Sequence, residues 1–141
     1  MKKKTFYLLS FTWGLPVTLL GYVSAIALKA LGYNSKKWGY CRYFELGDNW
    51  GGLNLGPVFF TDKESTESIR NHEFGHAIQN CIYGPFMLLI IAASAVRYWI
   101  REYKHRIKKV PYANLPPYDS IWFEGQATVY GTECIKNCKE E

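Results

Sequence analysis

Residues 5–28 form a run of 24 residues without a charged side chain, and no other feature restricts the fold of this chain as strongly. As a single helix the run would be about 36 Å long, enough to cross a hydrocarbon core of about 30 Å at a tilt. Three lysines at positions 2–4 precede it, and residues such as Gly14 and Pro16 are tolerated in membrane helices. We therefore predict an N-terminal transmembrane helix, with residues 1–31 as a membrane anchor.

A cleaved signal peptide is the alternative interpretation, because a basic start is combined with a cleavage-like stretch at Val23, Ser24 and Ala25. The apolar part would be too long for a signal peptide, however, and no polar break comes before the small residues. A retained anchor is therefore preferred. A chain of 141 residues has room for one domain beside it, which we place at residues 32–141.

His72, Glu73 and His76 belong to the pattern His-Glu-Phe-Gly-His, which has the form HEXXH. On a helix, positions i and i+4 project from one face, so both imidazoles can reach a single metal ion. Glu73 lies about 100° further around the axis, where it can hold a water molecule by its proton more easily than it can share the metal. The alternative is a polar helix face on which the two histidines are solvated and bind no metal.

A helix is predicted for residues 65–83. Its N-cap candidates are Thr61, Asp62 and Ser65, and acidic residues follow where the N-terminal dipole favours them. The Gly-Pro pair at residues 84–85 ends or kinks it. The HEXXH pattern then lies near the middle of the helix.

Two imidazoles and a carboxylate suit zinc, whose catalytic sites take three protein ligands and leave one position for water. Zinc lowers the pKa of water toward neutrality, and Glu73 is predicted to take the proton as the water attacks a carbonyl. The third ligand is sought after the motif, among His105, Asp119, Glu124 and Glu133.

Glu124 is the preferred third ligand because three apolar residues precede it, and an unpaired carboxylate is costly to bury there. The small residues Gly125 and Ala127 would let its helix pack closely on the motif helix. The alternative is a structural ion pair of Glu124 with Arg70 or Arg97.

The segment Glu-Gly-Gln-Ala-Thr at residues 124–128 resembles the second motif of gluzincin metallopeptidases, which commonly reads Asn-Glu-Gly-Phe-Ala-Thr/Ser. In that family, which includes the large zinc aminopeptidases, HEXXH lies on one helix and a zinc-binding Glu on the next. The resemblance implies that His72, His76 and Glu124 bind zinc and that Glu73 is the general base.

The spacing of the two motifs departs from the gluzincin pattern. Here 47 residues separate His76 from Glu124, more than in the aminopeptidases, and residues 85–117 account for most of the surplus. Residues 71–80, with the following Gly-Pro and hydrophobic run, also resemble a group of small, uncharacterised bacterial membrane proteins over about residues 44–132. That resemblance implies a bacterial inner membrane.

Residues 53–60 contain bulky apolar residues among glycines and follow a turn-rich segment at 47–52. They predict a small β-sheet or hairpin, so the fold class is α+β. The predicted order is the transmembrane helix, the sheet, the HEXXH helix, a long apolar-to-basic helix and a C-terminal helix with the third ligand. Zincins characteristically place a strand before the HEXXH helix, where its edge pairs with an extended peptide substrate. A sheet that only covers the helix is an equal alternative.

Residues 82–96 form a second uncharged run, which is short for a membrane span. Tyr98 and Trp99 follow it, together with basic residues at helical spacings of three and four: Arg97, Arg101, Lys104, His105 and Lys108. This combination is typical of a helix at the membrane interface. A basic patch can also bind nucleic acid, but the adjoining lipophilic run favours membrane lipid, so membrane lipid is the predicted partner and nucleic acid is not.

The three proposed ligands must meet at one ion, so the chain between them cannot cross the bilayer an odd number of times. The polar return through residues 108–119 cannot cross lipid with its backbone unsatisfied. Residues 82–106 are therefore predicted to dip into the membrane or lie along it, which makes 85–109 a membrane-associated segment. Positions 2–4 favour an external site, whereas the basic residues after the first span favour a cytoplasmic one slightly more.

The four cysteines, Cys41, Cys81, Cys134 and Cys138, are predicted to be free thiols. Cys81 lies in the motif helix and the last two share one helix face, which suits a reducing compartment. None of them is needed as a metal ligand.

Together these features predict a membrane-anchored zinc metallopeptidase with a peptide or protein substrate. A zinc hydrolase of a lipid-linked amide or ester is the first alternative, and a non-enzymatic membrane interaction module with a structural metal site is the second. The second is disfavoured because a structural site needs no base such as Glu73. Tyr112, Tyr118 and Tyr130 are candidates for stabilising the oxyanion, because a phenol can donate to it. The sequence predicts no oligomeric state.

Overall fold

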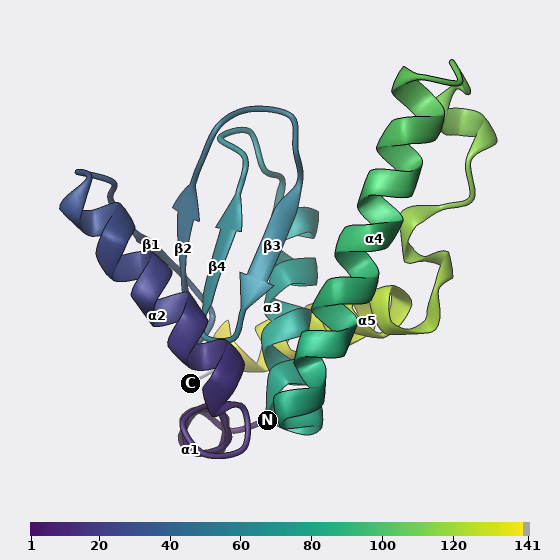
Figure 1. Ribbon diagram of the computed structural model, residues 1–141. Coiled ribbons are helices and arrows are strands. Elements are labelled where there is room, and N and C mark those ends of the chain that lie inside the picture. Colours follow the sequence, from purple (N-terminus) through teal and green to yellow (C-terminus); the bar gives the residue numbers. More distant parts are fainter. Residues whose placement is uncertain (140–141) are drawn as a thin grey trace.

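The computed structural model describes residues 1–139, and within them five α-helices are combined with one four-stranded sheet (Figure 1). The helices are α1 (Lys3–Ser10), α2 (Leu15–Ala30), α3 (Glu67–Tyr83), α4 (Met87–Arg106) and α5 (Trp122–Lys139). The strands are β1 (Lys36–Trp38), β2 (Cys41–Glu45), β3 (Gly52–Leu55) and β4 (Val58–Thr61). Short 3₁₀ helices are η1 (Gly84–Phe86), η2 (Tyr112–Asn114) and η3 (Tyr118–Ser120). The predicted α+β class is confirmed.

The prediction of one helix over residues 5–28 is wrong, because α1 and α2 meet at an angle of 92°. A side chain at Gly14 would place its Cβ 2.4 Å from Asn80 Nδ2, so the bend lets the backbone lie directly on α3. Asn80 Nδ2 donates to Gly14 O at 3.3 Å and to Thr18 Oγ1 at 3.2 Å. Pro16 lies in the first turn of α2, where its missing N–H leaves no helical hydrogen bond unmade.

The sheet has the order β1-β2-β4-β3, so β3 is an edge strand. The β3–β4 hairpin was predicted and turns at Gly56, whose φ of +71° is rarely adopted by other residues. Strands β1 and β2 were not predicted, because their exposed face is charged: Lys36 Nζ lies 2.8 Å from Glu45 Oε2. Strand β2 joins the hairpin by parallel pairing with β4.

Helix α3 packs on the sheet on one side and on α5 on another (Figure 1). Its contact with α5 is a backbone contact: a Cβ at Gly75 would lie 1.8 Å from Ala127 O, and one at Gly131 would lie 1.7 Å from Asn71 O. Ala127 thus has the packing role expected of it. Gly125 does not, since it faces Asp119 O instead.

Helix α3 begins two residues later than predicted. Thr66, which was not among the N-cap candidates, caps it by accepting from Ile69 N at 3.3 Å. The Gly-Pro pair forms η1, as expected of a kink, and α4 continues from it.

The helical run Glu67–Arg106 has 40 residues and is long and apolar enough to span a membrane. A core helix of a soluble protein can have the same length and composition, but only 22% of the most apolar 18-residue stretch of this helix is buried. The chain then returns beside α4 (Figure 1). Arg97 Nη2 donates to Pro117 O at 2.8 Å and to Tyr118 O at 2.9 Å, and Arg101 donates to Pro116 O.

Candidate metal centre

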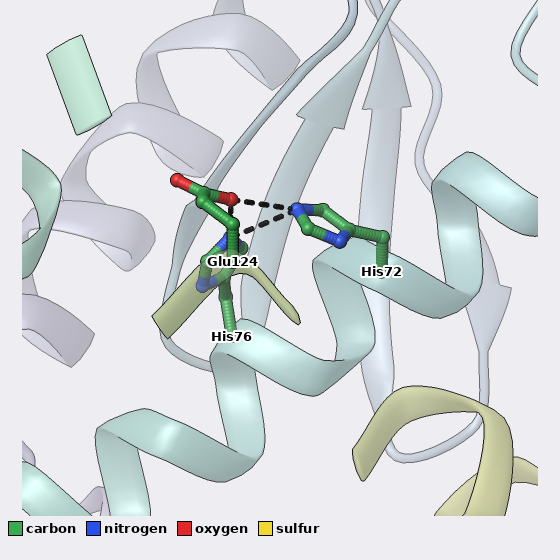
Figure 2. A group of neighbouring side chains, drawn as sticks. All are labelled: His72, His76 and Glu124. Carbon is green, nitrogen blue, oxygen red and sulfur yellow. Dashed lines mark hydrogen bonds and ion pairs between the residues drawn. The ribbon is translucent and has the colours of Figure 1, made fainter. Parts of the chain in front are cut away.

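Three side chains from α3 and α5 converge on one point (Figure 2). Glu124 Oε2 lies 3.0 Å from His72 Nε2 and 3.2 Å from His76 Nε2, and the two Nε2 atoms are 3.1 Å apart. In a tetrahedral site with ligand bonds of about 2.0–2.1 Å, the ligand atoms are roughly 3.3–3.4 Å apart. The group could therefore hold a metal ion with little rearrangement.

The orientation of the His76 ring is set by Gln79, one turn along α3. Gln79 Nε2 donates to Phe123 O at 2.7 Å and to Gln126 Oε1 at 2.9 Å, which fixes the orientation of the amide. Gln79 Oε1 lies 2.7 Å from His76 Nδ1 and must accept from it. His76 therefore donates through Nδ1, and Nε2 is the atom turned toward His72 and Glu124.

Thr128 has the same effect on His72. With its Oγ1 donating to Glu124 O at 3.3 Å, it can accept from His72 Nδ1, which lies 2.9 Å away. Both Nε2 atoms and a carboxylate oxygen thus point at one another at 3.0–3.2 Å. A proton on Nε2 can join one such pair of atoms, whereas a metal ion at the centre would satisfy all three at once.

Glu124 is fully buried. Burial alone would raise its pKa, but hydrogen bonds with His72 and His76 hold the pKa below its usual range. Ser94 of α4 donates to Oε1 at 2.5 Å, so both carboxylate oxygens have partners. Glu124 is therefore an ionised group poised beside the two histidines.

The alternative ion pair of Glu124 with an arginine is not formed. Arg70 donates to Ser65 O and lies over the Trp38 ring, 4.7 Å from its centroid. Arg97 donates to Pro117 O, just before η3, and to Tyr118 O, the first residue of η3.

The remaining candidates for the third ligand lie outside the group. His105 Nδ1 donates to Val110 O at 3.1 Å, and its ring stacks on Tyr112. Asp119 lines a cavity next to the three side chains but is not one of the converging groups. Glu133 lies elsewhere on α5.

Glu73 is buried beside this group, and its Oε2 has no hydrogen-bond partner within residues 1–139. Its carboxylate lies against the edge strand β3 at Gly52, where a Cβ would lie 2.3 Å from Glu73 Oε1. Burial raises the pKa of Glu73 to about 8, with a further increase from Glu124 and an opposing effect of His72. A cation held by the neighbouring histidines would stabilise the ionised form.

A cavity of about 710 Å³ opens beside the three converging side chains. Its lining comes from the edge strand β3, from α3 and α4, from the start of α5, and from the segment 112–119 that returns beside α4. Tyr112 and Tyr118 line it, whereas Tyr130 packs against the core on another side of α5.

The positioning residues Gln79, Thr128, Ser94 and Gly52 were missed in the sequence. Helical spacing could have found two of them, because Gln79 lies three residues after His76 and Thr128 four after Glu124. Ser94 and Gly52 come from elements whose packing no local pattern specifies.

Comparisons with models of protein families, with curated proteins and with solved structures find no match to this chain.

Proposed function

We propose that this protein is a membrane-associated zinc metallopeptidase in which His72, His76 and Glu124 hold the metal. The observation that carries the proposal is the convergence of both Nε2 atoms and one carboxylate oxygen at 3.0–3.2 Å from one another. Protein oxygens lie beside both Nδ1 atoms, so the Nε2 atom of each ring faces the place of the ion. Ligating histidines are held by partners of this kind in known metal sites.

Zinc is the preferred ion because two imidazoles and one carboxylate form a ligand set of its catalytic sites, with a fourth position open. A purely structural zinc site usually has four protein ligands, and within residues 1–139 only three groups converge.

When bound, zinc polarises a carbonyl and acidifies a water molecule. Glu73 is the general base in this proposal. It takes the proton of the attacking water through its free Oε2 and later returns it to the leaving amine. Gly52 leaves room for its carboxylate against β3.

Tyr118 is the proposed donor to the oxyanion. It lines the cavity, and Arg97 and Arg101 each lie 5.7 Å from its ring centroid. Burial raises its pKa, with Glu124 and Glu73 adding to the increase, so the phenol keeps its proton. Tyr112 is less suitable because its hydroxyl already donates to Glu102.

A peptide substrate is favoured by the position of β3. Among residues 1–139 this strand pairs with β4 alone, and residues 51–54 line the cavity next to the metal ligands. The free edge of a strand can pair with an extended peptide through main-chain hydrogen bonds.

Association with a membrane is supported by apolar side chains that are each more than 60% exposed: Leu8, Val23, Ile26, Phe86, Leu89 and Trp99. The elbow between α1 and α2 also touches the C-terminal end of α3, because Trp13 Nε1 donates to Ile82 O at 3.1 Å. Exposed apolar surface of this extent marks contact with a membrane or a partner. We propose that these segments seat the protein on lipid.

The test compares wild type with Glu73→Gln and His76→Ala. Elemental analysis should find about one zinc per chain in wild type and in Glu73→Gln, and none in His76→Ala. A casein or peptide-library screen should show hydrolysis by wild type only, since an amide cannot take the proton. Metal-free wild type that takes up no zinc on titration would refute the proposal.

A further inference from the structure

We infer that the substrate of this site is a peptide segment with consecutive large apolar side chains, which lie along α4. The inference rests on the proposed peptidase function and adds the class of peptide. It concerns the wall of the cavity formed by α4. This helix lies in residues 85–117, the segment that makes the distance in sequence between His76 and Glu124 longer than in the aminopeptidases.

The α4 wall of the cavity is an apolar helix face. Met87, Ile90, Ile91, Ala95 and Tyr98 line it at intervals of three and four residues, as one side of a helix does. Ser94 is the polar residue in this stripe, and its hydroxyl is already used by Glu124. From residue 87 to residue 98 the face extends about 16 Å, which equals roughly five residues of extended peptide.

The opposite wall has a different chemistry. Strand β3 offers backbone groups along its free edge, so the cleft has one hydrogen-bonding wall and one apolar wall. An extended peptide can satisfy both, with its backbone on the strand and bulky side chains on α4. A plain alkyl chain would cover only the apolar wall and would leave backbone groups of β3 desolvated without partners.

Apolar side chains also lie at the rim of the cavity, beside the charged residues Arg101, Glu102 and Asp119. Leu53 is 40% exposed and Trp99 69% exposed, and both line the cavity. The surface of α4 outside it carries Leu89 and Val96, also well exposed. Apolar surface therefore continues from the outside of α4 to the metal ligands. A polar peptide would lose its hydration against this wall without compensation, whereas a segment that partitions into lipid would gain contact.

The experiment uses zinc-loaded full-length protein and hydroxamates, which bind zinc through the same small group whatever chain they carry. The probes are acetohydroxamate, acetyl-trialanine hydroxamate, acetyl-trileucine hydroxamate and octanohydroxamate, with affinities measured by isothermal titration calorimetry. Each methylene that leaves water improves affinity roughly fourfold, so the trileucine probe should bind at least tenfold more tightly than the trialanine probe. It should also bind more tightly than octanohydroxamate.

Matched variants locate the effect. Ala95→Asn puts an amide in the cavity wall, whereas Ala92→Asn puts the same amide on the other side of α4, away from this cavity. Covering the amide introduced at position 95 with leucine side chains removes its water, so trileucine affinity should fall roughly tenfold in Ala95→Asn and stay unchanged in Ala92→Asn. Acetohydroxamate should bind both variants as it binds wild type.

The outcomes separate this inference from the proposed function. Failure of acetohydroxamate to bind wild type would refute the metal centre itself. Normal acetohydroxamate binding with equal affinity for trialanine and trileucine probes would overturn the apolar class, as would equal behaviour of the two variants. Tighter binding of octanohydroxamate than of the trileucine probe would assign the wall to an acyl chain instead of a peptide.

Discussion

Replacing Thr128 by valine should weaken zinc binding 10- to 100-fold while the fold stays intact. Thr128 Oγ1 accepts from His72 Nδ1 at 2.9 Å, and valine keeps the shape of the side chain but removes this acceptor. Without it, nothing holds the proton on Nδ1, and the tautomer with its proton on Nε2 becomes populated. Loss of a partner behind a ligating histidine typically costs this range of affinity, or about 1.4–2.7 kcal/mol.

Thr132→Val is the matched control. Thr132 is one turn further along α5, is exposed, and makes the same kind of hydrogen bond to the preceding turn, since its Oγ1 donates to Thr128 O at 2.8 Å. Both variants lose such a bond and have equal helix propensity, but only Thr128 contacts a proposed ligand. Zinc dissociation constants are measured by competition with a chromogenic chelator at fixed pH. Equal constants for the two variants would refute the assigned role of the His72 tautomer.

Three further predictions concern other parts of the molecule. Gly52→Ala should keep zinc but lower hydrolysis at least tenfold, because its Cβ would lie 2.3 Å from Glu73 Oε1 and displace the base; unchanged kcat/KM would contradict this. In metal-free protein, burial raises the pKa of Glu73 from 4.5 to about 8. The unfolded state therefore loses this proton at a lower pH than the folded state, and the free energy of unfolding should fall as pH rises from about 4.5 to 8. Denaturant titrations of metal-free Glu73→Gln across that range should lack this loss, and an identical pH dependence would argue against the buried carboxyl. The double variant Val23→Glu and Ile26→Glu should float poorly with liposomes compared with Thr132→Glu, since both α2 positions are about two-thirds exposed; equal flotation would exclude α2 from the lipid contact.

The convergence of the two motifs could be predicted because it depends on local rules. Residues i and i+4 of a helix share a face wherever the helix lies, which places His72 and His76 together. The cost of burying a lone carboxylate singled out Glu124, and the structure places it beside them. Their partners Gln79 and Thr128 follow the same helical spacing and were available to the same reasoning.

The path of the first thirty residues could not be predicted from composition. An uncharged run is equally compatible with a straight span and with two helices, and the choice depends on tertiary contacts of Gly14 and Thr18 with Asn80. Strands β1 and β2 were missed for a related reason. Their outer residues are charged, so only pairing with the distant hairpin identifies them as strands.

The backbone contact of α3 with α5 at Gly75 and Gly131 determines how metal binding relates to folding. No flexible side chain lies between the helices at these points, so the separation of the histidines from Glu124 is set by the helix backbones. The core around Phe6, Phe59 and Phe74 is complete without an ion. In zinc fingers the free energy of metal binding is the free energy of folding. Here the chain would fold first, and an ion would enter a preorganised site with almost no loss of conformational entropy.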